Sequence, residues 1–111
     1  MSKLTGLSVR IDAEKTRELR AAGIWRNRTI AEDARDWAAL EPDKVCMRDV
    51  YRAVTYREIL CEAQGLAAGL HALGLTAGDV VSFQLPNWIE AAAIDLAASL
   101  LGLVVNPIVP I

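Results

Sequence analysis

Few side chains in this sequence have the type and spacing that a catalytic site requires. His71 is the single histidine among 111 residues, and no acidic residue stands three or four positions from it. A histidine paired with a carboxylate is a common general base, whereas a lone histidine near a helix end is favoured by the helix dipole. We therefore expect His71 to be a partly exposed residue at a helix C-terminus, with general-base catalysis as the alternative.

Three glutamates are candidate acids, but each also occupies a helix-capping position. Glu32, Glu58 and Glu90 stand three residues after Thr29, Thr55 and Asn87, respectively. In such a capping box the first side chain accepts a hydrogen bond from the N3 amide, and the glutamate accepts one from the N-cap amide. The pattern predicts three helix starts, and we prefer this interpretation over acid catalysis by the glutamates.

The aromatic and thiol side chains are ambiguous in a similar way. Trp25, Trp37 and Trp88 are expected to anchor packing, because large aromatic side chains dominate core burial; an acyl-binding wall is the alternative. Cys46 and Cys61 lack the spacing of a metal site or redox pair. We expect both to be reduced thiols of a cytoplasmic protein, with a disulfide or metal site as the alternative.

Composition and charge argue against several classes of protein. The net charge is −2, which does not suggest a nucleic-acid-binding domain. Arg17, Arg20, Arg26 and Arg28 are offset by nearby acids, so we expect a solvated face rather than a polyanion site. Met1–Leu7 has no apolar signal core, which argues against secretion. The longest apolar stretch, Trp88–Leu101, contains two acids and is too short to span a bilayer.

The elements that must position these residues follow from periodicity and turn signals. We expect a peripheral helix from Asp12 to Ala22, then helices that begin at the three capping boxes, and an antiparallel hairpin of residues 45–48 and 53–55. The expected core faces are Ile30, Ala34, Trp37 and Ala38 in one helix, and Ile59, Ala63, Leu66, Leu70 and Leu73 in the next. Gly65 and Gly69 lie four residues apart in that second helix, where we expect another backbone to approach closely.

The C-terminal third predicts a strand-helix-strand unit. Val80–Leu85 forms the first strand, the helix after Asn87 is apolar on nearly every side, and a second strand follows Gly102. Parallel strands joined in this way need neighbours and covering helices, and the order of elements indicates an α/β fold. Asn106–Pro107, at the end of the second strand, has the best position for contact with a ligand, but we prefer to interpret the pair as a strand-terminating turn.

Several segments in a fixed order resemble a known family. They are Pro42-Asp43-Lys44-Val45, Val54-Thr55-Tyr56-Arg57-Glu58-Ile59, Gly78-Asp79-Val80-Val81, Leu85-Pro86-Asn87-Trp88 and Gly102 with Asn106-Pro107-Ile108-Val109-Pro110. The series resembles the beginning of the adenylate-forming, AMP-binding acyl-CoA synthetases. Ala22-Gly23-Ile24-Trp25 is similar to the lead-in of medium-chain and cyclic-carboxylate CoA ligases. One departure is Asp49-Val50-Tyr51-Arg52, where the family often has an Asp-Gly turn.

The resemblance implies both a reaction and a division of the chain. A carboxylate would react with ATP, accompanied by Mg²⁺, to give an acyl-adenylate, and CoA would then displace AMP. Residues 1–28 would form a lead-in with a peripheral helix, and residues 29–111 the start of a truncated ligase N-terminal domain. The family's Gly-rich phosphate loop and catalytic lysine match no position here. No catalytic, cofactor-binding or metal-binding residue is therefore expected in 1–111, and the acyl substrate, whether in fatty acid metabolism or elsewhere, stays open.

Two interpretations of the chain follow. In the first, it is the N-terminal fragment of an ATP-dependent carboxylate–CoA ligase, inactive when alone. In the second, it is one chain of a split ligase, or a non-catalytic interaction module, that docks through an unpaired sheet edge. Apolar residues make up 53% of the chain, which is more than a domain of this size readily buries. This composition favours either a missing partner polypeptide or a missing remainder of the same protein.

Overall fold

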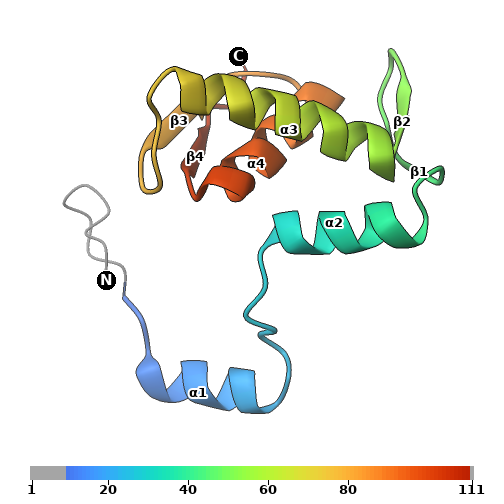
Figure 1. Ribbon diagram of the computed structural model, residues 1–111. Coiled ribbons are helices and arrows are strands. Elements are labelled where there is room, and N and C mark those ends of the chain that lie inside the picture. The colour runs from blue at the N-terminus through green and yellow to red at the C-terminus, as the bar shows by residue number, and fades with distance from the viewer. Residues whose placement is uncertain (1–9, 111) are drawn as a thin grey trace.

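The computed structural model describes residues 10–110 and shows a mixed α/β arrangement (Figure 1). Met1–Leu7, where no signal sequence is expected, and Ile111 lie outside the described residues. The elements follow the expected order: α1 (Ala13–Ala21), α2 (Ile30–Leu40), β1 (Val45–Arg48), β2 (Ala53–Thr55), α3 (Tyr56–Ala72), β3 (Val80–Phe83), α4 (Ile89–Leu101) and β4 (Val104–Pro107).

The strands form two separate pairs. β1 and β2 make the expected antiparallel hairpin, with an irregularity between Val45 and Met47. β3 and β4 are parallel, joined by α4, and their register runs from Val80 opposite Val104 to Phe83 opposite Pro107. The α/β fold class, with its small hairpin and its β-α-β unit, is therefore confirmed.

The core lies where the hairpin meets the N-terminal ends of α3 and α4. Val54, Ile59, Ile89 and Ala93 form a buried cluster. Farther along, the helices meet through small residues, and Ala63 and Ala97 have no exposed surface. Alanines at a helix contact let the two axes approach closely because no bulky side chain separates them. Figure 1 shows α3 lying along α4 over most of its length.

The faces of α2 and α3 agree with the expected ones only in part. In α2, Ala34 and Ala38 are half-buried as expected, but Ile30 and Trp37 are 55% and 44% exposed, while Ala31 is buried. The backbone N–H of Ala31 donates to Ser99 Oγ of α4 at 3.2 Å. In α3, Ile59 and Ala63 are buried as expected, but Leu73 is 79% exposed. Periodicity located the helices and the small residues of their inner faces, but it placed several large apolar side chains in the core that are in fact exposed.

One further expectation about the helices needs correction. No atom outside the helix would lie within 4 Å of a Cβ added at Gly65 or Gly69, so within the described part of the chain no other backbone approaches either glycine closely. The buried residues of α4 are Ile89, Ala93, Ala97 and Ala98. Among residues 10–110 there is no helix long and apolar enough to cross a membrane.

The first helix stands apart from this body. α1 is capped by Asp12, whose side chain accepts a hydrogen bond from Lys15 N, and it contains no buried residue. Gly23 follows with a φ of 71°, a left-handed conformation that glycine adopts readily at a helix C-terminus. The expected peripheral helix of residues 12–22 is therefore present, and Figure 1 shows it below α2.

Candidate functional site

Glu32 and Glu58, the glutamates of the first two capping boxes, accept hydrogen bonds at the starts of α2 and α3. Thr29 N donates to Glu32 Oε2 at 2.7 Å, and Glu32 N donates to Thr29 Oγ1 at 3.2 Å. Thr55 and Glu58 repeat the same reciprocal geometry, again at 2.7 and 3.2 Å. Hydrogen bonds from the threonine N–H groups lower the pKa of both glutamates. The structure thus confirms the first two capping boxes, in which an ionised carboxylate stabilises the helix start.

The prediction of a third capping box, formed by Asn87 and Glu90, is wrong. α4 begins at Ile89 with Trp88 at the N-cap, one residue later than the box required, and no N-cap side chain accepts a hydrogen bond there. Instead, Asp49 Oδ2 accepts from Ile89 N at 3.0 Å across 40 residues of sequence. The turn in which Trp88 N donates to Pro86 O shifts the helix start away from Asn87.

Asp49 is therefore a capping residue that sequence analysis missed. Its Oδ1 accepts from Tyr51 N at 2.8 Å and from Arg52 N at 2.9 Å, which shapes the hairpin turn. The hydrogen bond from Ile89, followed by that from Arg52, lowers the pKa of Asp49. The only signal in the sequence was an aspartate at the start of a turn, which typically binds amides two or three residues ahead.

Glu90 belongs to a cluster of charged side chains centred on Arg52 of the same turn. Arg52 donates to both carboxylate oxygens of Glu62 in α3, at 2.5 and 2.9 Å, and to Glu90 in α4 at 3.1 Å. These carboxylates raise the pKa of Arg52, and Arg52 lowers that of Glu62. The turn of residues 49–52, where the chain departs from an Asp-Gly sequence, thus contacts the second turn of α3 and the first turn of α4.

His71 and the two cysteines lie outside this cluster of charged side chains. His71 is exposed in the last turn of α3, as expected. Cys46 is half-buried in β1, and burial raises the pKa of its thiol, so it stays protonated at neutral pH. Cys61 is exposed on α3, and neither cysteine forms a disulfide. Within residues 10–110, no three His, Cys, Asp or Glu side chains are grouped so that they could hold a metal ion.

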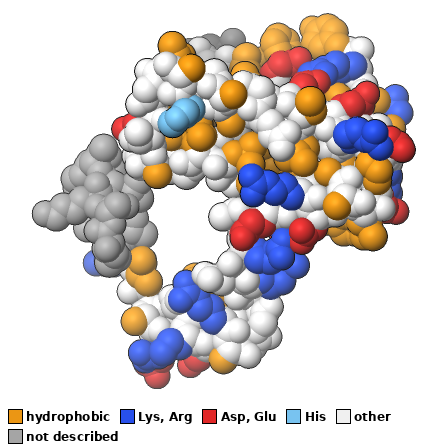
Figure 2. Space-filling model, in the orientation of Figure 1, with side chains coloured by type: hydrophobic (Ala, Val, Ile, Leu, Met, Phe, Trp, Pro, Cys, Tyr) orange, Lys and Arg blue, Asp and Glu red, His pale blue; other side chains and the backbone are white. Residues whose placement is uncertain are grey.

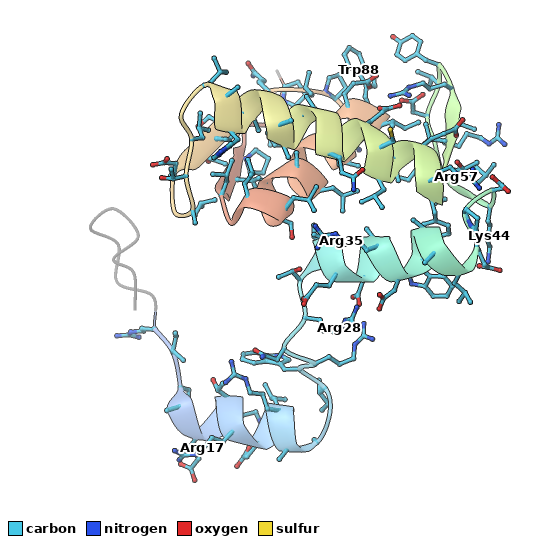
Figure 3. All side chains as sticks on the ribbon, in the orientation of Figure 1. Arg17, Arg28, Arg35, Lys44, Arg57 and Trp88 are labelled. Carbon is cyan, nitrogen blue, oxygen red and sulfur yellow. The ribbon has the colours of Figure 1, made fainter. Side chains whose placement is uncertain are left out.

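The tryptophans make surface contacts rather than a common wall. Trp37 stacks on Tyr56 with ring centroids 5.8 Å apart, and Lys44 Nζ lies 6.0 Å from the Trp37 centroid. Trp88 meets Tyr51 edge to face at 5.6 Å and lies at the upper side of the molecule in Figure 3. Trp25 is 50% exposed in the loop after α1.

Two of the four arginines expected on a solvated face are ion-paired. Asp33 pairs with Arg26 at 3.1 Å and with Arg28 at 2.9 Å, and Arg28 also binds Asp36. Figure 2 shows acidic and basic side chains interleaved over this part of the molecule, and Figure 3 shows Arg28 beneath α2. For the whole patch, which also contains Arg17 and Arg20, the solvated face stays a prediction.

The carboxyl ends of β3 and β4 form the candidate site. Asn106 Nδ2 donates to Ser82 Oγ of the neighbouring strand at 3.1 Å, and both side chains are exposed. Beside them is a hollow of about 320 Å³ lined mainly by apolar residues, with Phe83, Leu85 and Pro107 among them. Ligands of open α/β sheets bind at this edge. The position of Asn106–Pro107 is therefore consistent with a place near a ligand.

One carboxylate in this hollow was not among the candidate residues of the sequence analysis. Asp95, on the face of α4 toward β4, also lines the hollow. Its Oδ1 is buried, with no hydrogen-bond partner among the described residues. Burial raises the pKa of Asp95. The available signal was a lone acid within an otherwise apolar helical stretch.

With this geometry in place, comparison with known proteins identifies the family. A family model described as AMP-binding enzyme matches residues 34–111. The chain belongs to the AMP-binding enzyme family. The salicylyl-CoA synthase / salicylate adenylyltransferase of Streptomyces sp is 37% identical over 84 residues, covering 76% of this chain and 15% of that protein. The medium-chain fatty-acid–CoA ligase of Escherichia coli is 35% identical over 92 residues, covering 82% of this chain and 16% of that protein.

A solved structure extends the likeness to the lead-in. The apo structure of MbtA from Mycobacterium smegmatis superposes with a TM-score of 0.84 at 32% identity, covering 99% of this chain and 21% of that one. The resemblance to adenylate-forming ligases inferred from the sequence is thereby confirmed. Its narrower association with fatty acid metabolism is not, since the AMP-binding relatives also include enzymes named for aromatic acids and for pyochelin synthesis.

Proposed function

We propose that this chain supplies the N-terminal part of an ATP-dependent carboxylate–CoA ligase and has no catalytic activity when alone. Support comes chiefly from the family match over residues 34–111, together with the β3-α4-β4 unit that these residues form. The acidic side chains that could have served catalysis are occupied: Glu32 and Glu58 cap helices, and Glu90 binds Arg52. The chain spans 15% and 16% of the two curated relatives described above, so the complete reaction is assigned to a larger assembly.

The proposed reaction uses ATP with Mg²⁺, a carboxylic acid and CoA. The acid would first form an acyl-adenylate with release of pyrophosphate, and CoA would then replace AMP. None of the described side chains is assigned to these groups. What this chain contributes is the β3-α4-β4 unit, whose strand ends lie at the edge where such folds bind ligands. We propose the cytoplasm as the compartment, which the two disulfide-free cysteines support.

Pyrophosphate exchange tests both halves of the proposal. The chain alone, incubated with ATP, labelled pyrophosphate and a panel of carboxylates, should give no exchange. A chimera in which the chain replaces the matching segment of the Escherichia coli ligase should retain exchange with medium-chain acids. Exchange by the chain alone would show that the active site lies within it. A folded but inactive chimera would contradict the assignment as a ligase segment.

A second candidate function is a split ligase or interaction module. It is favoured by β4, which pairs only with β3 within residues 10–110 and so presents its other edge. In this alternative a separate polypeptide completes the enzyme. Purification of the tagged natural chain from its own host discriminates the two functions. A stoichiometric companion that carries the Gly-rich phosphate loop, and that restores exchange when added back, would favour the split enzyme.

A further inference from the structure

Asp95 is in an unusual environment for a carboxylate. On α4 it is flanked one turn away by Ala91 and Ser99, and Ala98 shares its face of the helix. Its Oδ1 is shielded from solvent and accepts no hydrogen bond from any described residue. Buried polar atoms in proteins are almost always paired, since an unpaired carboxylate loses its hydration without compensation. Asp95 as a whole is half-buried, but its shielded oxygen lacks a protein partner among the described residues.

Three hollows adjoin this residue. One, of about 570 Å³, extends from Thr29 to Val105 beside α4 and β4. The second, of about 320 Å³, is the one at the carboxyl ends of the parallel strands. The third, of about 220 Å³, lies between α4 and the hairpin, where Arg48 also contributes. Their linings are largely apolar, and Asp95 is the one residue common to all three.

The shape and charge of this surface indicate what covers it. β4 has a free edge within the described residues, and an added strand would place alternate side chains over the face of α4. Of the basic residues in the described chain, only Arg48 lines a hollow together with Asp95, and none forms an ion pair with it. A positive charge on Asp95 would therefore come from the covering segment or from a rearranged Arg48.

We propose that Asp95 is the recognition carboxylate of a docking surface for an extended polypeptide segment that presents an arginine or lysine between apolar side chains. The segment runs along the free edge of β4, with its apolar side chains in the hollows and its basic group on Oδ1. The docking surface consists of β4 and the α4 face of Ala91, Asp95 and Ala98. This inference rests on the proposed function, because the segment belongs to the remaining part of the ligase.

Peptide binding to the full chain tests the charge requirement. The probes are two pools of short, end-blocked peptides with Val, Ile, Leu and Phe randomised around a fixed central position. That position is arginine in one pool and citrulline, its neutral counterpart, in the other. The best arginine peptide should bind at least roughly tenfold more tightly than its citrulline partner, as expected for a desolvated charge pair. Asp95→Asn should reduce this ratio to near one, whereas Asp43→Asn, at an exposed site, should preserve it.

The stability of the same variants shows whether Asp95 already has a partner within the free chain. If Asp95 is unpaired in the free chain, Asp95→Asn should raise the urea midpoint of unfolding at neutral pH while it weakens peptide binding. A lower midpoint would mean that Arg48 or another group of the chain already pairs with Asp95, and the proposal would fail. Equal binding of both pools, or no binding at millimolar concentration, would also refute it. The exchange assay of the chimera is independent of peptide binding, so failure of the docking surface and failure of the ligase assignment are distinguishable.

Discussion

Replacement of Gly102 by alanine should destabilise the chain through two separable effects. Gly102 ends α4 with φ 72° and ψ 28°, and its N–H donates to Ala98 O. An L-residue in this left-handed conformation costs about 1–2 kcal/mol. In addition, the new Cβ would lie 3.2 Å from Ala77 Cβ, closer than ordinary van der Waals contact. Such overpacking adds about 1 kcal/mol, so Gly102→Ala should cost about 2–3 kcal/mol in total.

Gly74→Ala is the matched control. Gly74 follows α3 with a φ of 93°, but no atom lies within 4 Å of an added Cβ. The control therefore carries the backbone strain without the steric contact and should cost about 1–2 kcal/mol. The pair separates the contribution of left-handed backbone geometry from that of packing against the turn before β3.

Urea unfolding followed by circular dichroism measures both variants, with the linear slope checked for constancy. Ala77→Gly, combined with Gly102→Ala, should recover about 1 kcal/mol beyond additivity, since it removes the atom that the new methyl group meets. If Gly102→Ala and Gly74→Ala cost the same, or if Ala77→Gly gives no recovery, the steric part of the reasoning is wrong.

Three further predictions concern the core, the long-range cap and pH. Ile89→Ala, at a site only 2% exposed, should lower the unfolding free energy by about 2–5 kcal/mol, while Ile108→Ala, at an exposed position, should have little effect in the same urea assay. Asp49→Ala should lower the thermal midpoint and increase amide hydrogen exchange in the first turn of α4 but not of α3; equal exchange in both helices would contradict its role as the α4 cap. Because the folded-state pKa of Glu58 is depressed below 4.5, its stabilising effect is present above that pH and is lost as the pH falls through the depressed value. Glu58→Gln should therefore flatten the acid limb of a midpoint-against-pH curve, and an unchanged limb would refute the argument.

The sequence predicted the elements well because their signals are local. Two capping boxes and the turn signals of the hairpin act over a few residues, and the structure contains the helix starts and the hairpin that they predict. The start of α4 was misplaced because its cap, Asp49, lies 40 residues away. Ile30, Trp37 and Leu73 were wrongly placed in the core. Alanines make many of the helix contacts instead, and tertiary packing rather than side-chain size decides which residues do so. Asp95 was overlooked for a related reason: only the fold shows that its oxygen lacks a partner.

The cap that Asp49 provides has a consequence for the order of folding. α3 carries its own capping box, and the backbone bonds from Tyr56 N to Lys44 O and from Arg57 N to Pro42 O tie it to nearby chain. The hairpin and α3 can therefore form from contacts of short sequence separation, which close rapidly. α4 lacks an N-cap side chain of its own and acquires one only after the hairpin turn exists. We expect high φ-values in the hairpin and early α3, and low φ-values at the start of α4, so that during synthesis the β-α-β unit is completed on a scaffold already folded.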